Sequence, residues 1–301
     1  MINLSIIPTS YCNCDCCYCY LGDSRKDKTI LDLDLLQQRL DQIQDAFTGI
    51  SIYGGEIGLL DLKYLDQLFK IVNKYSDDVC CQTSLTNLKI IDVCRDNNIK
   101  IGVSINEERK TNRKTIRNWN KLSIDVQREL SILSVVLPSI INSDPKQLLE
   151  YYQKFNCKQV TFIPYSPSVN NHGLYHITNN DYQDFMINIL TEYLDNINKY
   201  NFTIGNLIRY TLGNNCLDNE YLMIDPRGDF VNIKYTEDNL EYFKRYDNCD
   251  DWRISNKHCV LSQCLTCKYL NNHCMADHIK LNNIGDCCCG YYDLCQFLES
   301  K

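Results

Sequence analysis

The sequence lacks the features of a membrane-spanning or exported protein. Its longest apolar stretch, LSILSVVLPSII at residues 130–141, is interrupted by serine and proline and is too short to cross a bilayer. The N-terminal residues also lack a basic segment followed by an apolar one, which is the pattern of a secretory signal. We therefore expect a cytoplasmic protein with no membrane partner.

Basic clusters are scarce as well. The chain has 31 lysine and arginine residues against 38 aspartate and glutamate residues, for a formal net charge of -7. Nucleic-acid-binding proteins usually concentrate positive charge on one face, and no run rich in lysine or arginine occurs here. This excludes nucleic acid as the main partner. The sequence also has no internal repeat and no low-complexity tract.

Cysteine, in contrast, is abundant, with 19 residues in a chain of 301. Without an export signal and with an odd total, these thiols are expected to bind metal rather than to form disulfides. Five of them lie in TSYCNCDCCYCYLG, residues 9–22. This segment is compatible with a zinc knuckle built on a C-x2-C pair. It is also compatible with a three-thiolate cluster site, C-x3-C-x2-C, through Cys12, Cys16 and Cys19.

The order of the expected elements indicates an α/β fold. Six β-type runs are predicted at residues 3–9, 49–55, 79–84, 100–106, 129–137 and 159–165. Apolar residues recur at helical spacing, mostly behind an aspartate cap, over residues 32–47, 61–75, 144–156 and 179–200. Repeated β-α units of this kind predict a parallel sheet, either in a full or partial barrel or in a doubly wound arrangement.

The composition of the sequence changes after about Cys216. Cysteine density rises, and one hairpin is expected over residues 221–233 with its turn at 226–229. We predict two domains, residues 1–205 and 206–301, of which the second is small and stabilised by metal ligands.

Two motifs are expected to meet at one edge of this sheet. The first cysteine segment follows the first strand, at the carboxyl end where α/β proteins place their active sites. A cubane iron–sulfur cluster normally has four thiolate ligands, so three would leave one iron open. Gly54-Gly55-Glu56 ends the second strand, where the glycines expose backbone groups to a ligand and the carboxylate can meet a cationic amine. A zinc site does not require a Gly-Gly-Glu segment on the neighbouring strand, so the presence of both motifs favours an iron–sulfur cluster over zinc.

Together, PTSYCNCDCCYCY and YGGE resemble the radical S-adenosylmethionine (radical SAM) superfamily, over about the first two-thirds of the chain. The resemblance implies a partial (β/α)6 TIM-like barrel. It implies that a [4Fe-4S] cluster binds Cys12, Cys16 and Cys19, and that the methionine group of S-adenosylmethionine chelates the open iron. The cofactor contacts that it implies are Tyr18, Gly54, Gly55 and Glu56.

Weaker matches extend the resemblance to the ends of the third and fourth strands. The segments QTSLTN, residues 82–87, and GVSINEERKTNRK, residues 102–114, are similar to cofactor-binding stretches of the superfamily. They add Ser84, Ser104 and Asn106 as cofactor contacts and Arg113 as a supporting residue. Ile57 replaces the usual proline after the glutamate. The remaining thiols of the first segment, Cys14 and Cys17, are expected not to bind the cluster.

The C-terminal cysteines resemble the SPASM/twitch extension found behind many radical enzymes. Their spacing alone is compatible with zinc or with iron and sulfur. The resemblance implies one auxiliary [4Fe-4S] cluster bound by Cys264, Cys267, Cys274 and Cys288. Alternatives stay open: the last ligand could be Cys287, Cys289 or Cys295, and a second auxiliary site could use Cys216 with Cys249 or Cys259. The other cysteines are expected in the core: Cys80, Cys81, Cys94 and Cys157.

The resemblance implies an oxidoreductase that cleaves S-adenosylmethionine to a 5'-deoxyadenosyl radical and removes hydrogen from a ribosomally made peptide, as a peptide maturase. It also implies a flavodoxin- or ferredoxin-type electron donor. The alternatives are a dehydrogenase of a small alcohol or sugar and, more distantly, a non-enzymatic metal or electron-transfer module. No catalytic base or hydrogen donor can be named from the sequence.

Overall fold

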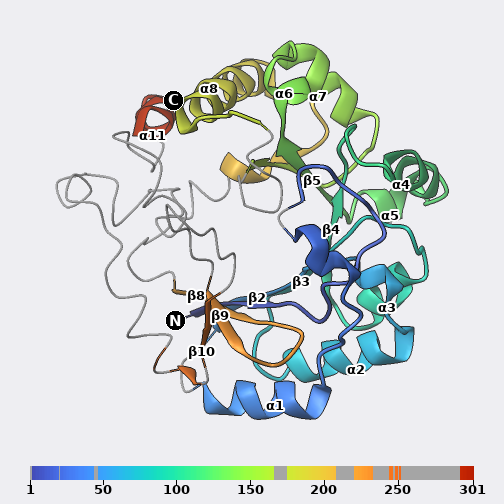
Figure 1. Cartoon of the computed structure of the whole chain (residues 1–301). Helices are drawn as coiled ribbons and strands as arrows, with labels where there is room; N and C mark the ends of the chain where they lie inside the picture. Colours follow the sequence, from blue (N-terminus) through green and yellow to red (C-terminus); the bar gives the residue numbers. More distant parts are fainter. Residues whose placement is uncertain are drawn as a thin grey trace.

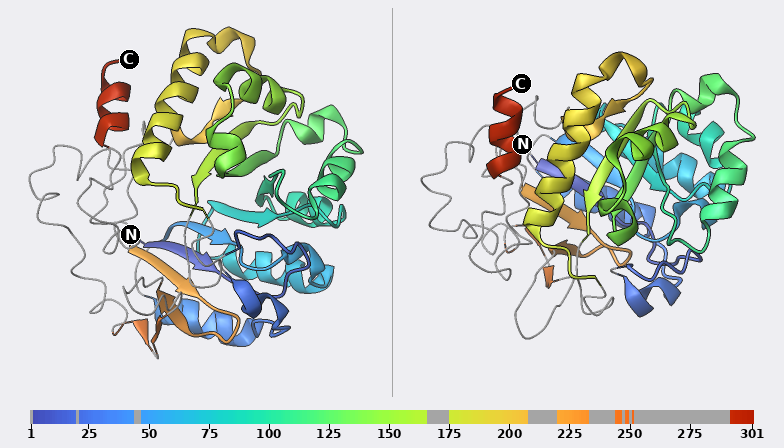
Figure 2. Two further views of the ribbon diagram at one scale, coloured as in Figure 1. Left: turned by 45° about the horizontal axis from the view of Figure 1, so that its top comes forward. Right: turned by 90° about the horizontal axis from the view of Figure 1, so that it is seen from above.

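The computed structural model describes residues 2–19, 21–43, 47–165, 175–207, 220–232, 244–246, 248–249, 251 and 292–301. Within these residues the chain forms a ten-stranded sheet in the order β10-β9-β8-β1-β2-β3-β4-β5-β6-β7. The sheet is curved, and most of the helices line its outer side (Figure 1). The two further views in Figure 2 show the same arrangement.

The six predicted parallel strands are confirmed. They are β1 (Ile2–Ile6), β2 (Phe47–Ile52), β3 (Val79–Thr83), β4 (Lys100–Ser104), β5 (Ser131–Val136) and β6 (Gln159–Pro164). Each pairs in parallel with the next, and the short β7 (Thr203–Ile204) continues the series beyond β6. A doubly wound sheet would reverse its strand order in the middle, so this unbroken order identifies the barrel type. The barrel is partial, because β1 pairs with β8 rather than with β6 or β7.

The predicted hairpin is also present, and it extends the same sheet. β8 (Glu220–Ile224) pairs in parallel with β1, β9 (Phe230–Asn232) pairs antiparallel with β8, and β10 (Lys244–Tyr246) pairs antiparallel with β9. In the turn, Asp225 Oδ1 accepts hydrogen bonds from the amides of Arg227 and Asp229 at 2.8 and 3.0 Å. The division into domains at residue 205 stays a prediction.

Three of the helices begin at aspartate caps, as the sequence predicts. The longer ones are α1 (Leu33–Gln42), α2 (Leu62–Val72), α3 (Ile90–Asp96), α4 (Asn112–Trp119), α7 (Pro145–Gln153), α8 (Asn179–Asp195) and α11 (Tyr292–Glu299). The side chains of Asp32, Asp61 and Asp144 accept hydrogen bonds from the first turns of α1, α2 and α7. Short helices complete the set: α5 (Ile124–Gln127), α6 (Pro138–Ile141), η1 (Gly22–Lys26), η2 (Ile57–Leu59) and η4 (Ile197–Lys199).

Some predicted boundaries are wrong, and the helix expected over residues 179–200 ends at Asp195. The helix expected over residues 32–47 ends at Gln42, and Phe47 is instead the first residue of β2. Phe47 pairs with Ile2 of β1, so a contact between distant segments overrides the local helical pattern.

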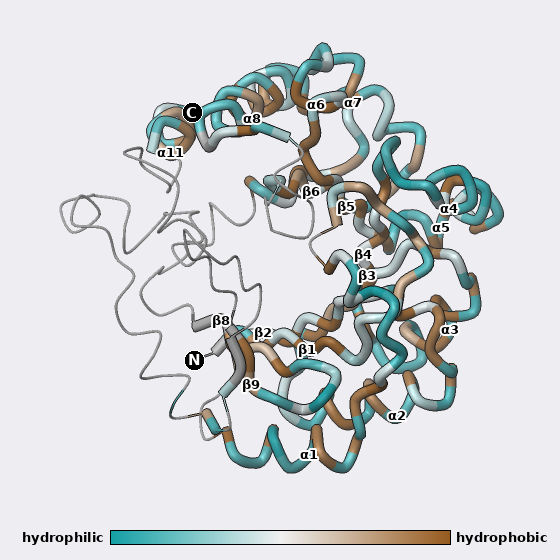
Figure 3. The backbone as a smooth tube through the Cα atoms, in the orientation of Figure 1, coloured by the Kyte–Doolittle hydropathy of each residue, from teal (hydrophilic) through white to brown (hydrophobic). Residues whose placement is uncertain are grey.

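The core lies between the sheet and the helices that cover it. Its largest cluster takes buried aliphatic and aromatic residues from β1 to β7 and from the covering helices. The helices at the rim alternate between hydrophobic and hydrophilic residues in Figure 3, as expected when one face is buried. The predicted core cysteines Cys81, Cys94 and Cys157 are buried, and Cys80 is half-buried. Within the described residues, no helix is both long and apolar enough to cross a membrane.

The C-terminal helix α11 packs beside α8, as Figures 1 and 2 show. Gln183 of α8 is 4% exposed, and its Oε1 accepts hydrogen bonds from the amides of Asp293 and Leu294 at 3.0 and 3.3 Å. A side chain of α8 therefore satisfies the first amides of α11.

Candidate functional site

The cysteine loop, residues 7–19, follows β1 and lies directly against the turn that follows β2. The amide of Gly55 donates to the carbonyl of Thr9 at 2.8 Å, and the amide of Glu56 donates to the carbonyl of Tyr11 at 2.9 Å. The two motifs expected at one sheet edge are thus joined through their backbones.

The two glycines are required by this close packing. Gly54 has a φ of +134°, and a Cβ built on it would lie 2.4 Å from Ile7 Cγ2. A Cβ on Gly55 would lie 2.2 Å from the carbonyl oxygen of Tyr11, closer than any side chain can approach. The absence of side chains at both positions therefore lets the loop and the turn touch, in addition to the ligand role expected from the sequence.

The Glu56 carboxylate is 2% exposed and accepts hydrogen bonds on both oxygens. Oε1 accepts from Thr83 Oγ1 and from the Gly58 amide, the latter at 3.0 Å. Oε2 accepts from the Ser84 amide at 2.7 Å and from the Ser84 hydroxyl. Burial and the nearby Cys14 raise the pKa of Glu56, although the bonds from Ser84 and Thr83 oppose this. A cation that reached this carboxylate would stabilise its charged form.

The five thiols of the loop differ in exposure. Cys14 is fully buried, Cys12, Cys16 and Cys19 are half-buried, and Cys17 is exposed. Within the described residues, no three histidine, cysteine, aspartate or glutamate side chains lie close enough together to hold a metal ion. The ligand role of Cys12, Cys16 and Cys19 stays a prediction.

The buried side chain of Cys14 contacts Ser84, the residue that follows β3. Its Sγ lies 3.1 Å from Ser84 Oγ and 3.8 Å from Glu56 Oε2. Its amide donates to Cys12 Sγ at 3.4 Å. The side-chain hydrogen bond with Cys12 lowers the pKa of Cys14, and Arg109 and Ser84 act in the same direction against burial. No motif in the sequence gives a role to Cys14.

The predicted contacts at Ser84, Ser104 and Asn106 lie at the neighbouring ends of β3 and β4. Asn106 Nδ2 donates to the carbonyl of Val135 at 2.8 Å, and Asn106 Oδ1 accepts from the amide of Val135 at 2.9 Å. The amide side chain therefore continues the pairing between β4 and β5. Ser104 is half-buried, and its carbonyl accepts a hydrogen bond from Arg109 Nη1 at 3.2 Å.

Arg109 is the cation of the site, and sequence reasoning missed it. Burial acts to lower its pKa, but the neighbouring Cys16, Tyr18 and Cys14 outweigh burial and raise it. Its Nε has no hydrogen-bond partner among the described residues. Arg113, expected to support the cofactor, is exposed on α4. The only signal for Arg109 in the sequence is its place in the same loop, five residues after Ser104.

Most predicted ligands of the auxiliary cluster lie outside the described residues. These are Cys264, Cys267, Cys274 and Cys288, together with the alternatives Cys216, Cys259, Cys287 and Cys289. The alternatives Cys249 and Cys295 are described, and both belong to the hydrophobic core. Cys295 is fully buried in α11.

The α/β fold is shared with anSMEcpe and SuiB, both of which have been solved with S-adenosylmethionine bound, so the expected type of fold is confirmed. Native anSMEcpe with bound AdoMet and Cp18Cys peptide has a TM-score of 0.70 at 19% identity, over 99% of this chain and 96% of its own. SuiB from Streptococcus suis bound to S-adenosylmethionine has a TM-score of 0.66 at 16% identity, over 89% of this chain and 71% of its own. SuiB bound to precursor peptide SuiA has a TM-score of 0.62 at 17% identity, over 89% and 70%. No protein-family model matches the chain, and no curated protein matches its sequence.

Proposed function

We propose that this protein is a radical SAM enzyme that modifies a ribosomally made peptide. The observation that carries the proposal is the backbone contact between the cysteine loop and the Gly-Gly-Glu turn, at the carboxyl edge of a partial barrel. Among structures with this fold, anSMEcpe contains AdoMet and the Cp18Cys peptide, and SuiB contains S-adenosylmethionine in one structure and the precursor peptide SuiA in another. The reaction expected on the peptide is a crosslink, an epimerisation or an oxidation.

The loop thiols are donors of the type that binds an iron–sulfur cluster. Burial raises the pKa of Cys16 to about 11 and also raises the pKa of Cys19, so both thiols are protonated near neutral pH. Because a thiol must lose its proton to bind iron, these raised pKa values oppose binding, and the iron–thiolate bonds would have to offset that cost. We assign Cys12, Cys16 and Cys19 as ligands of a [4Fe-4S] cluster with one open iron. When bound, the cluster and S-adenosylmethionine supply a 5'-deoxyadenosyl radical, which removes hydrogen from the substrate.

The site offers opposite charges to the two ends of an amino acid, which suits the methionine part of the cofactor. Glu56 is the buried anion, and its raised pKa means that a bound ammonium would relieve the cost of its charge. Arg109 is the cation, and its unpartnered Nε can donate to a carboxylate. We assign the amine to the Gly54–Glu56 turn and the carboxylate to Arg109. The further contacts proposed from the sequence are Tyr18, Ser84, Ser104 and Asn106.

Two additional proposals rest on the resemblance of the sequence, the first on its C-terminal cysteine pattern and the second on the superfamily as a whole. One auxiliary [4Fe-4S] cluster would bind Cys264, Cys267, Cys274 and Cys288, and a flavodoxin- or ferredoxin-type protein would supply electrons. An auxiliary cluster could accept an electron from the substrate radical or brace the C-terminal region.

Metal analysis after anaerobic reconstitution tests the proposal. We expect about eight irons per chain in the wild type and about four when Cys12, Cys16 and Cys19 are all replaced by alanine. Cys17→Ala is the matched control, because it removes an exposed thiol of the same loop. The reduced wild type should also form 5'-deoxyadenosine. Zinc in place of iron at the loop, or no 5'-deoxyadenosine under strong reductant, would overturn the proposal.

A further inference from the structure

We propose that Asp15 is a positioning residue whose carboxylate clamps the middle of the cysteine loop between two other segments of the protein. The clamp holds Cys14 and Cys16, on either side of Asp15, in a fixed arrangement. This inference deepens the proposed function, and its consequences for a bound cluster rest on that function. The clamp itself is a property of the polypeptide and can be tested without a cluster.

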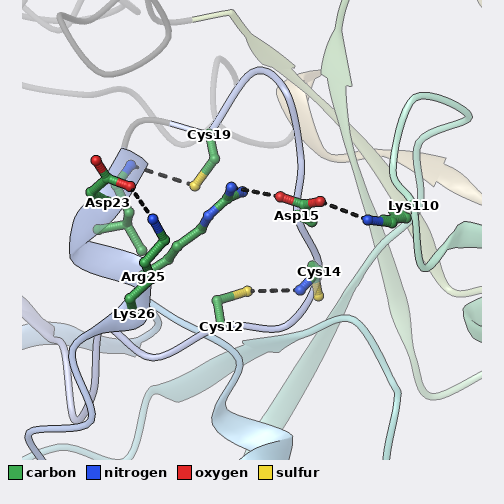
Figure 4. A network of polar contacts seen from close by, with 9 residues as sticks. Cys12, Cys14, Asp15, Cys19, Asp23, Arg25, Lys26 and Lys110 are labelled. Atoms are coloured by element: carbon green, nitrogen blue, oxygen red, sulfur yellow. Dashed lines mark hydrogen bonds and ion pairs between the residues drawn. The ribbon is translucent and has the colours of Figure 1, made fainter.

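Each carboxylate oxygen of Asp15 binds a different cation, as Figure 4 shows. Oδ1 lies 2.6 Å from Arg25 Nη2 in η1, and Oδ2 lies 2.8 Å from Lys110 Nζ in the loop between β4 and α4. Lys110 is 95 residues away from Asp15 in the sequence. One side chain therefore joins the cysteine loop to two segments on opposite sides of it.

Arg25 holds the loop at a second point. Its carbonyl oxygen accepts a hydrogen bond from the amide of Cys12 at 2.9 Å, while its guanidinium pairs with Asp15. The Arg25 side chain is 27% exposed, against 74% for Lys110, so it is the better shielded of the two partners. A single residue of η1 thus fixes both the first predicted ligand and the midpoint of the loop.

The backbone of the loop needs such side-chain support. Among the described residues, positions 13–18 make no backbone hydrogen bond to another element. Asp15 has a φ of +50°, in the left-handed region that aspartate and asparagine adopt more readily than other non-glycine residues. The chain therefore turns sharply between Cys14 and Cys16, and the contacts of Asp15 hold that turn.

The clamp also brings charge beside the loop thiols. Asp15 is negative and lies between Cys14 and Cys16 in the sequence, and Lys110 is positive and pairs with it at 2.8 Å. A reduced cluster carries one more negative charge than an oxidised one. Removal of the Asp15 charge should therefore favour reduction, and removal of the Lys110 charge should disfavour it. A merely structural role would move the reduction potential of both variants in the same direction or not at all.

Amide hydrogen exchange on the full-length protein as purified tests the clamp first. Asp15→Asn keeps the shape of the side chain, and asparagine also adopts the left-handed conformation readily, but the substitution removes the negative charge. We expect the amides of Cys12 and Cys19, which donate to the carbonyls of Arg25 and Cys16, to exchange about fivefold faster in this variant, and faster also in Lys110→Met. Lys26→Met is the matched control, because Lys26 pairs with Asp23 at 2.6 Å within η1 and not with the loop. Exchange in Asp15→Asn at the wild-type rate would overturn the proposal.

The reduction potential of the reconstituted protein is the second measurement. We expect a higher midpoint potential in Asp15→Asn, a lower one in Lys110→Met and no change in Lys26→Met. Shifts of the same sign in the first two variants would overturn the electrostatic role of the clamp. If the wild type takes up no iron, the proposed function fails, whereas faster exchange in Asp15→Asn would still support the clamp.

Discussion

The amide of Glu56 donates a hydrogen bond to the carbonyl oxygen of Tyr11 at 2.9 Å. Tyr11 precedes the first predicted cluster ligand, and Glu56 ends the Gly-Gly-Glu turn. The bond therefore holds the proposed metal-binding loop and the proposed amine-binding turn in one backbone arrangement. A change in either segment should disturb the other.

Gly55→Ala tests this contact. The new Cβ would lie 2.2 Å from the Tyr11 carbonyl oxygen, so the loop must move away from the turn. We expect a loss of about 1–3 kcal/mol in the free energy of unfolding, measured by urea denaturation, and a lower iron content after reconstitution. Gly49→Ala in β2 is the control, because its Cβ would have its nearest neighbour at 3.5 Å, an ordinary contact. Equal stability of the two variants would contradict the close packing.

The pH dependence of stability should report on Glu56. Its pKa in the folded protein is raised above the ordinary value of 4.5, chiefly by burial, so the unfolded chain loses this proton at lower pH than the folded one. The contribution of Glu56 to stability is therefore present below the ordinary pKa and is lost as pH rises through the raised one. The Glu56→Gln variant has no ionisable group at this position, so its stability lacks this pH-dependent contribution.

Urea titrations across this pH range should show the consequence. The stability of the wild type relative to Glu56→Gln should fall as pH rises, in protein without S-adenosylmethionine. Glu129→Gln, which removes a carboxylate that is 50% exposed, controls for the loss of one negative charge. A difference between wild type and Glu56→Gln that stays constant with pH would argue against the raised pKa.

Asn106→Ala should destabilise the protein independently of any ligand. The variant would leave both the amide and the carbonyl of Val135 without the partners they have in the structure. Because Asn106 is 2% exposed, we expect a cost of about 1–3 kcal/mol in the free energy of unfolding. Ser104→Ala, at the end of the same strand, should retain its stability and report more directly on cofactor affinity. Unchanged stability in Asn106→Ala would show that the amide does not support the sheet.

The cysteines should react with iodoacetamide in an order set by burial, because the thiolate is the reactive form and must be accessible. Cys17 is exposed and should be modified first. Cys81 is 1% exposed, and burial raises the pKa of Cys157 to about 12, so both should resist modification in the folded protein. Peptide mass spectrometry before and after unfolding in urea makes the comparison. Modification of Cys157 as fast as that of Cys17 would be inconsistent with this core.

The strands and helices could be predicted because their patterns are local. Alternating apolar residues marked β5 within 129–137, and Asp144 capped α7 as expected. The error at residue 47 has a different origin, since Phe47 continues a helical pattern but pairs with Ile2 in the sheet. A window of neighbouring residues contains no information about a strand that lies far away in the sequence.

By itself, the sequence determined the α/β fold, a parallel sheet of six strands and the meeting of the cysteine segment with Gly-Gly-Glu, whereas the order of the strands came from the structure. Each of these predictions follows from short-range periodicity or spacing and from the rule that parallel strands end at the same edge. Only the tertiary structure decided that Arg109 is the cation of the site and that Asp15 pairs with Lys110. Charge interactions depend on distance in space and on burial, and loops from separate strands set both only once the sheet has formed.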